Sequence, residues 1–161
     1  MMFVNIGGTN IKIGHLTQMG SLNDVLAIGN SYRINEGLQP ITLSSWLRKR
    51  QTWDFINEVE RQLELIDNPN ENPKCENHTL DSGENSQIDY NELIKNSTAI
   101  KSQRGGKVEN RGVWANLYIM IKLAAYMSPK LEFEIIDCFI HNKILMWRDI
   151  SGDEFKSLNK A

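Results

Sequence analysis

The strongest constraint on the fold is the run Leu117–Met127, which is apolar on almost every side of a helix. Its one charged residue is Lys122. Asn116, just before the run, is the predicted N-cap, because its side-chain oxygen can accept a hydrogen bond from a free N–H group of the first turn. Ser128 and Pro129 follow as the N-cap and first residue of another helix, where the missing N–H of proline has no cost. A helix without a polar face needs cover on every side, so the sequence predicts a domain built around this helix.

Two further helices differ in length. The helix that begins at Pro129 is predicted to continue to about Arg148, and the residues expected to face inward are Phe133, Ile136, Phe139, Ile140 and Ile144. A short helix is predicted over Ser21–Ile28, with Ser21 as its N-cap and Gly29-Asn30 as its end. Residues 30–40 are then expected to form a loop.

A pair of helices is predicted over Ile41–Arg50 and Trp53–Ile66, because apolar residues recur at near-helical spacing in both segments. Thr52 is interpreted as the N-cap of the second helix. Trp53 follows this cap and is expected to be the more exposed tryptophan, whereas those expected in the core are Trp46 and Trp114.

Two β-hairpins complete the predicted fold. Apolar and polar residues alternate along Phe3–Ile13, on both sides of Gly7-Gly8, a pair suited to a tight hairpin turn. Ala99–Ile100 and Val113–Ala115 are the predicted arms of a second hairpin, or wing. The fold class is therefore α+β, with β-hairpins packed on a helix pair and on a buried central helix.

Residues 67–97 differ from the rest of the chain in charge. They carry seven acids and two bases, a net charge of −5, whereas the whole chain carries −2, which leaves +3 for the remainder. Large apolar residues are scarce there before Ile88, so the segment is interpreted as a long surface loop or flexible insertion. We expect residues 1–148 to form one domain with this insertion, and 149–161 to form a polar tail that could lead into a further C-terminal region.

Patterns typical of other function classes are missing from the sequence. The histidines and cysteines have no metal-ligand spacing, and no nucleophile motif or chemically paired carboxylates occur, so we expect no catalysis, no metal and no cofactor. No apolar run approaches the ~18 residues of a membrane span, and no signal peptide is recognisable. We therefore expect a cytoplasmic protein that does not bind membranes, and the sequence leaves its oligomeric state open.

One basic segment has the character of an anion-binding loop. A glycine pair lets the backbone approach a ligand closely, and neighbouring cations supply charge. Phosphates could meet the glycine N–H groups and the cations, while Gln103, Arg104 and Asn110 could reach base edges. The alternative is a hairpin tip with solvated charges. The candidate nucleic-acid contacts are Lys101, Gln103, Arg104, Gly105, Gly106, Lys107, Asn110 and Arg111.

A second basic set lies between the paired helices. Cations there could grip phosphates, with the N–H groups near Thr52 as an anion site. The alternative is a helix C-terminus whose cations complement the helix dipole, followed by an ordinary cap. The candidate residues are Arg48, Lys49, Arg50 and Thr52.

Taken in order, these landmarks resemble the KilA-N domain, which is found in proteins of bacteriophages, prophages and large DNA viruses. The resemblance covers about residues 10–148. The matching landmarks are Leu22-Asn23-Asp24, Trp46-Leu47 with the cations after it, Thr52-Trp53-Asp54-Phe55-Ile56, Arg104-Gly105-Gly106, Gly112-Val113-Trp114-Ala115, the apolar helix, and Ser128-Pro129-Lys130-Leu131.

The resemblance implies a small, winged-helix-like domain related to the APSES domain of fungal transcription factors. It also implies binding of double-stranded DNA without catalysis or metal, in a phage-type regulator or antirepressor. The acidic character of residues 67–97 leaves a second hypothesis open. The protein would then be an interaction module that binds a host or phage protein, such as a repressor or a defence component.

Overall fold

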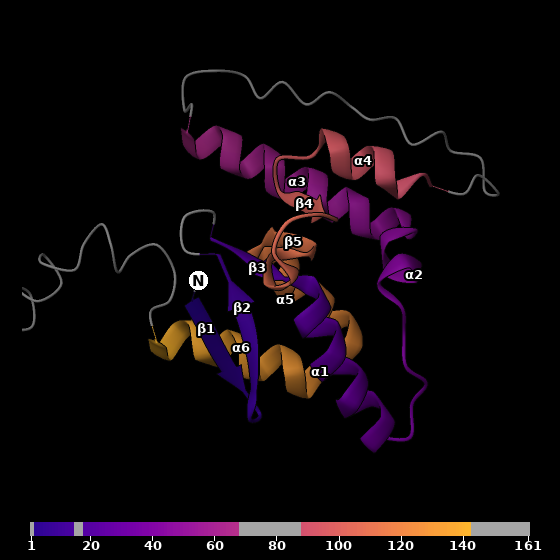
Figure 1. Cartoon of the computed structure of the whole chain (residues 1–161), viewed down its shortest axis with the longest axis vertical. Helices are drawn as coiled ribbons and strands as arrows, with labels where there is room; N and C mark the ends of the chain where they lie inside the picture. Colours follow the sequence, from indigo (N-terminus) through magenta and orange to yellow (C-terminus); the bar gives the residue numbers. More distant parts are fainter. Residues whose placement is uncertain (1, 15–17, 68–87, 143–161) are drawn as a thin grey trace, which may run out of the picture.

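The structure is a computed structural model that describes residues 2–14, 18–67 and 88–142 (Figure 1). Within these ranges the strands form one sheet, in which every neighbouring pair is antiparallel. In spatial order the strands are β1 (Met2–Ile6), β2 (Thr9–Ile13), β3 (Met19–Ser21), β5 (Gly112–Asn116) and β4 (Ile100–Gln103). The helices are α1 (Leu22–Asn35), α2 (Leu43–Leu47), α3 (Arg50–Asp67), α4 (Tyr90–Asn96), α5 (Leu117–Met127) and α6 (Pro129–Asn142). The predicted α+β class is confirmed.

Both predicted hairpins are present. Strands β1 and β2 pair from Met2↔Ile13 to Ile6↔Thr9, so Gly7-Gly8 forms the two-residue turn, with φ of 58° and 83°. Strands β4 and β5 pair from Ile100↔Ala115 to Gln103↔Gly112, and the connection between them contains a short 3-10 turn, η1 (Val108–Asn110). The third strand, β3, was not predicted and joins the two hairpins into one sheet.

Helix α5 has the predicted bounds and the predicted central position. The Asn116 side chain accepts a hydrogen bond from the N–H of Tyr118 at 2.9 Å, as expected of an N-cap. The helix contacts α1, α3 and α6 as well as strands β3 and β5. One narrow side is nevertheless exposed, formed by Tyr118, Lys122 and Tyr126, although Lys122 lies over the Phe55 ring and Lys49 over the Tyr126 ring. The apolar pattern therefore overestimated the burial of this helix.

Helix α1 is longer than predicted, because Gly29 does not end it. A Cβ at Gly29 would lie 2.5 Å from the sulfur of Met127, so this glycine allows α1 and α5 to pack closely. The helix ends instead before Gly37, at φ 79°. There the N–H of Gly37 donates to the carbonyl of Ile34, and that of Leu38 to Arg33, the hydrogen bonds of a Schellman motif. The predicted loop shrinks accordingly.

Helices α2 and α3 replace the predicted pair Ile41–Arg50 and Trp53–Ile66 with different bounds. Thr42 caps α2, and α3 already begins at Arg50, so Thr52 is not an N-cap. Its hydroxyl donates to the carbonyl of Trp46 at 2.8 Å, and its side chain is buried. Trp53 is buried too, with its indole N–H donating to the carbonyl of Leu47, so the prediction of an exposed Trp53 was wrong.

Helix α6 begins at Pro129 as predicted, with Ser128 as its cap, and Phe139 faces inward as predicted, but Phe133 and Ile140 do not. The buried residues are Leu131, Ile135 and Phe139, whereas Phe133 and Ile140 are 68% and 65% exposed. The tight α5–α6 junction fixes this phase, because Met127 and Ser128 are both buried and carry Leu131 inward. Ile144 and Arg148 lie outside the described residues.

Helix α4 lies inside the segment that the sequence predicted to be a loop or flexible insertion. Ile94 is buried against the core, and so is Ser97, just after the helix. The prediction was therefore wrong for residues 88–97, while 68–87 lie outside the described residues. Figure 1 shows α4 beside α3 and next to the β4 edge of the sheet.

Candidate nucleic-acid interface

The β4–β5 hairpin is anchored at its base and projects at its tip. Ile100 is fully buried, whereas the next three residues of β4 are exposed. At the other arm, the side chain of Asn23 from α1 accepts a hydrogen bond from the N–H of Val113 at 2.8 Å. The indole N–H of Trp114 donates to the carbonyl of Asn110 at 2.9 Å, which ties the connecting segment to β5. The hairpin is thus a fixed support for its tip.

Two of the predicted contact residues build the tip itself. The guanidinium of Arg111 donates from Nε and Nη2 to the carbonyl of Gly106, at 3.2 and 3.0 Å. The side-chain amide of Gln103 donates to the carbonyl of Gly105 at 3.2 Å. Both side chains are exposed, so Arg111 still adds positive charge to the surface while it holds the turn closed.

Three cations of the hairpin are exposed with neither an ion pair nor a side-chain hydrogen bond among the described residues, namely Lys101, Arg104 and Lys107. Several cations elsewhere in the described ranges do have ion-pair partners. Lys12 lies 3.9 Å from the carboxylate of Asp24, and other pairs are formed by Arg61 with Glu58 and by His141 with Asp137. The hairpin cations are therefore available to an external anion.

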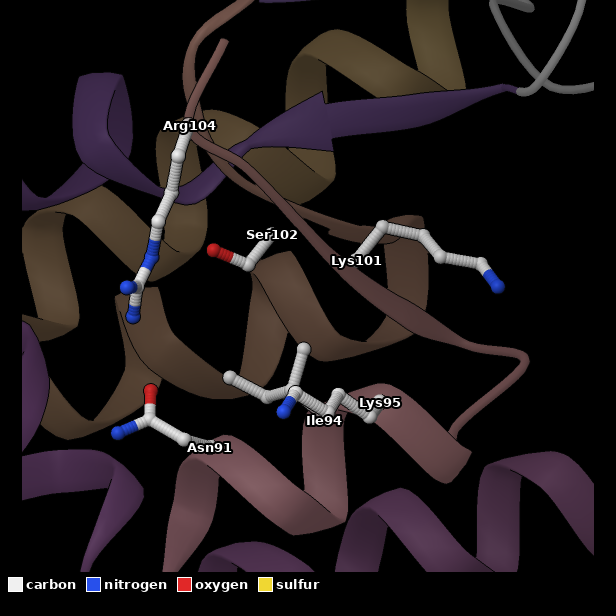
Figure 2. A pocket seen from close by; sticks show the side chains of 6 residues that line it. All are labelled: Asn91, Ile94, Lys95, Lys101, Ser102 and Arg104. Atoms are coloured by element: carbon white, nitrogen blue, oxygen red, sulfur yellow. The ribbon is translucent and has the colours of Figure 1, made fainter.

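A cleft of about 450 Å³ opens between α4 and β4. Figure 2 shows Arg104 reaching across it toward Asn91, whereas Lys101 extends in another direction. None of the described residues that line it is acidic; they are Asn91, Ile94, Lys95, Lys101, Ser102 and Arg104. The cleft thus brings two predicted hairpin residues together with three polar residues that the sequence interpretation missed.

The α4 wall of the cleft is held in place by α3. The hydroxyl of Ser97 donates a short hydrogen bond to the carboxylate of Glu60 and accepts from the N–H groups of Ala99 and Ile100, each at 3.2 Å. The N–H of Thr98 also donates to Glu60, at 3.2 Å. This network fixes the chain between α4 and β4, and with it the distance between the two walls.

The second predicted basic set lies near this cleft but is largely engaged within the protein. The Arg48 guanidinium lies 5.6 Å from the ring centroid of Tyr90, the first residue of α4, and the Lys49 ammonium lies 5.4 Å from that of Tyr126. Arg50 is exposed at the start of α3. Thr52 is buried, which removes it as a phosphate contact. Arg48 therefore joins the α2–α3 junction to α4, which forms one wall of the cleft.

Other functional features are scarce in the ranges that the structure describes. There, no three His, Cys, Asp or Glu side chains lie together as metal ligands would, and none of the helices has the length and apolar character of a membrane span. The pKa of Tyr32 is raised to about 12 by burial and by its hydrogen bond to the Glu134 carboxylate. This tyrosine lies on α1, far along the sheet from the cleft.

Comparison with known protein families identified one match. The KilA-N domain matches residues 40–145, which include both walls of the cleft and the basic tip. The match begins later than the resemblance did, so Leu22-Asn23-Asp24 fall outside it. No curated protein and no solved structure matched the chain. Because the matched segment makes up more than half of the chain, the protein belongs to the KilA-N family, a family of DNA-binding domains.

Proposed function

We propose that the protein binds double-stranded DNA through the β4–β5 hairpin, as a phage- or prophage-type regulator or antirepressor in the cytoplasm of a bacterial host, without catalysis. The observation that carries the proposal is the set of exposed, unpartnered cations Lys101, Arg104 and Lys107 within the KilA-N segment of the described chain. Free cations on a projecting, rigid hairpin are what contact with a phosphate backbone requires.

The residues of the hairpin would have different roles. Lys101, Arg104 and Lys107 would contact phosphates, and Gly105 would let the backbone approach, since no other atom lies within 4 Å of a Cβ placed there. Gln103 and Arg111 hold the turn, with Gly106 as the acceptor for Arg111. Asn110 is half-buried and would reach base edges only from the rim.

Arg48, Lys49 and Arg50 would add a weaker, longer-range attraction. Two of these cations already lie over aromatic rings, so moving them to a phosphate would give up those cation–π interactions. Arg50 has no ring or carboxylate contact of this kind among the described residues and would contribute most.

The test compares Arg104→Ala/Lys107→Ala with Arg61→Ala/Lys130→Ala, which removes the same charge from residues that have partners inside the protein. Duplex binding is measured by anisotropy at about 50 and about 200 mM salt. Each phosphate-binding cation removed should weaken binding roughly tenfold at about 0.1 M salt and reduce the log–log salt slope by about 0.9, so the hairpin double variant should lose roughly a hundredfold in affinity and about 1.8 in slope. If the hairpin variant binds no more weakly than the control variant, the hairpin is not the DNA contact. A separate selection from a random duplex pool would identify the DNA sequence that a regulator binds.

The acidic charge of residues 67–97 favours a second candidate function, binding of a host or phage protein. Deletion of the whole segment would also remove α4, so neutralising substitutions are the better test. The acids to change to their amides are Glu71, Glu76, Asp81 and Glu84. Loss of a specific, identified protein partner with DNA affinity unchanged would support this candidate, and no change in either would exclude an interaction role for these acids.

A further inference from the structure

We infer that the cleft between α4 and β4 is a phosphate-binding site, and that in the proposed complex its ligand is a phosphodiester of the DNA backbone. The inference rests on the proposed function for the source of the phosphate. It adds α4, which the hairpin proposal does not use, as a second wall of the contact surface.

The chemistry of the cleft selects an anion. Lys95 comes from α4, while Lys101 and Arg104 come from β4 and the residue after it, and the described lining includes no carboxylate. Asn91 and Ser102 add neutral hydrogen-bond donors. Arginine offers a planar pair of N–H groups that fits phosphate oxygens, and lysine supplies a point charge, so together they favour a phosphate over a single carboxylate.

The size of the cleft favours a phosphate ester rather than a small inorganic ion. A volume of about 450 Å³ lies within the range of roughly 300–1,000 Å³ that is typical of small-molecule sites. Ile94 lines the cleft but is buried, so the exposed groups of the lining are the polar and charged ones. A nucleotide unit with its phosphate near Lys95 and Arg104 fits both the volume and the polarity, while Lys101, which extends in another direction, adds longer-range positive charge (Figure 2).

The walls of the cleft are also positioned before a ligand arrives. Ser97 and Glu60 fix the turn between α4 and β4, and the ring of Tyr90 contacts Arg48 at the other end of α4. A preformed site loses less conformational entropy on binding. Because phosphates carry no base identity, this site should add affinity for every duplex equally and should not change sequence preference.

The experiment compares Lys95→Gln with Lys130→Gln, an equal loss of charge from a lysine of α6 that lies 4.9 Å from the Tyr32 ring centroid. We expect Lys95→Gln to weaken binding roughly tenfold at about 0.1 M salt and to lower the salt slope by about 0.9, by the same factor for two unrelated duplexes. Lys130→Gln should match the wild type. Asn91→Ala, which keeps all charges, should weaken binding with the slope unchanged.

Titration of the isotopically labelled protein with inorganic phosphate, a mononucleotide and a short duplex separates the possible sources. Amide shifts at Asn91 and Ser102 with the duplex alone assign the site to the DNA backbone; shifts with the mononucleotide, lost in Lys95→Gln, assign it to a free nucleotide. The inference fails if Lys95→Gln keeps both the affinity and the salt slope, and neither phosphate nor mononucleotide shifts these amides. Absence of duplex binding by the wild type would instead reject the proposed function, while the phosphate titration would still test the cleft.

Discussion

The two edges of the sheet differ in whether their polar side chains have partners within the protein. At the β1 edge, the hydroxyl of Tyr32 donates to the Glu134 carboxylate at 2.5 Å, and Lys130 lies over the Tyr32 ring. At the β4 edge, Lys101 and Arg104 line a cleft without a carboxylate among its described lining residues. Both edges carry cations, so the number of charges does not distinguish them. The two edges differ in whether their cations have partners within the described protein, and this difference favours the β4 edge as the proposed binding surface.

The tips of the two hairpins also differ in their contacts with the rest of the protein. A Cβ at Gly7 would lie 2.5 Å from the hydroxyl oxygen of Tyr32, so the β1–β2 turn packs against α1. A Cβ at Gly105 would meet no atom within 4 Å, so the β4–β5 tip projects from the domain. Gly8 is as open as Gly105, so the two tips differ in what their crowded glycine meets: Gly7 meets Tyr32 of α1, whereas Gly106 meets Gln103 of its own hairpin.

Charge reversal at each edge gives the largest expected difference. Arg104→Glu and Lys130→Glu change the net charge equally, one in the cleft and one over the Tyr32 ring. We expect Arg104→Glu to weaken duplex binding roughly a hundredfold at about 0.1 M salt, because a repulsion replaces an attraction. Lys130→Glu should weaken it by less than about threefold, through the general field alone. Anisotropy titrations measure both.

Equal effects of these two variants on affinity would show that only net charge matters, and the distinction between the edges would fail. Thermal unfolding of both proteins provides the control for folding. Arg104 is exposed, so its reversal should leave the melting temperature nearly unchanged.

A smaller effect should follow from loosening the cleft without touching a cation. Ser97→Ala leaves the Glu60 carboxylate without its hydroxyl donor and two N–H groups without their acceptor, at a cost of about 1–3 kcal/mol. We expect duplex binding by the folded protein to weaken roughly threefold to tenfold, because the two walls must be ordered on binding. Urea unfolding and anisotropy at one salt concentration measure the two effects.

Ser128→Ala is the matched control at the other edge. It removes the N-cap of α6, where the hydroxyl accepts from the N–H of Leu131 at 3.4 Å, and should cost about 1 kcal/mol. Its duplex affinity should equal that of the wild type. A similar decrease in affinity in both variants would mean that general stability, not the cleft, controls binding.

The sequence predicted those elements whose signals are local. Asn116 and Ser128 cap helices because their own side chains accept from the following turn, and Gly7-Gly8 turn because of their own backbone freedom. Local signals misled where a distant residue decides the outcome. The sequence predicts that Gly29 ends a helix, but in the structure its lack of a Cβ leaves room for the side chain of Met127. The sequence also predicts that Thr52 is a helix cap, but its hydroxyl donates to the carbonyl of Trp46 instead.

For the same reason, the sequence predicted only the hairpin part of the candidate site. The hairpin cations follow each other in the chain, so the sequence alone could name them as candidates. Lys95 joins them only through α4, whose apolar residues Leu93 and Ile94 lie at the end of an acidic, polar segment. Their spacing after Asp89 was the available signal. The cleft itself depends on Glu60 holding Ser97, a contact between residues 37 positions apart.

The smallest expected effect on DNA binding is that of a substitution at the β1 edge, which should change stability and leave duplex affinity unchanged. Burial, and then the hydrogen bond and charge of Glu134, raise the pKa of Tyr32 from 10.0 to about 12. The folded state thus holds this proton more tightly than the unfolded state. Its stabilising contribution is complete below about pH 10 and should be lost as the pH rises toward about 12.

Tyr32→Phe isolates this contribution, because it removes the phenol hydroxyl that donates to Glu134 and keeps the aromatic ring. The difference in free energy of unfolding between wild type and variant, measured with urea, should shrink as the pH rises from about 9 to about 12. A constant difference over this range would mean that the Tyr32–Glu134 bond does not hold the phenol proton. Duplex affinity near neutral pH should be the same for both proteins, since Lys130, the cation described beside Tyr32, is not in the proposed binding surface. A weaker Tyr32→Phe complex would therefore extend the binding surface to the β1 edge and remove the contrast between the two ends of the sheet.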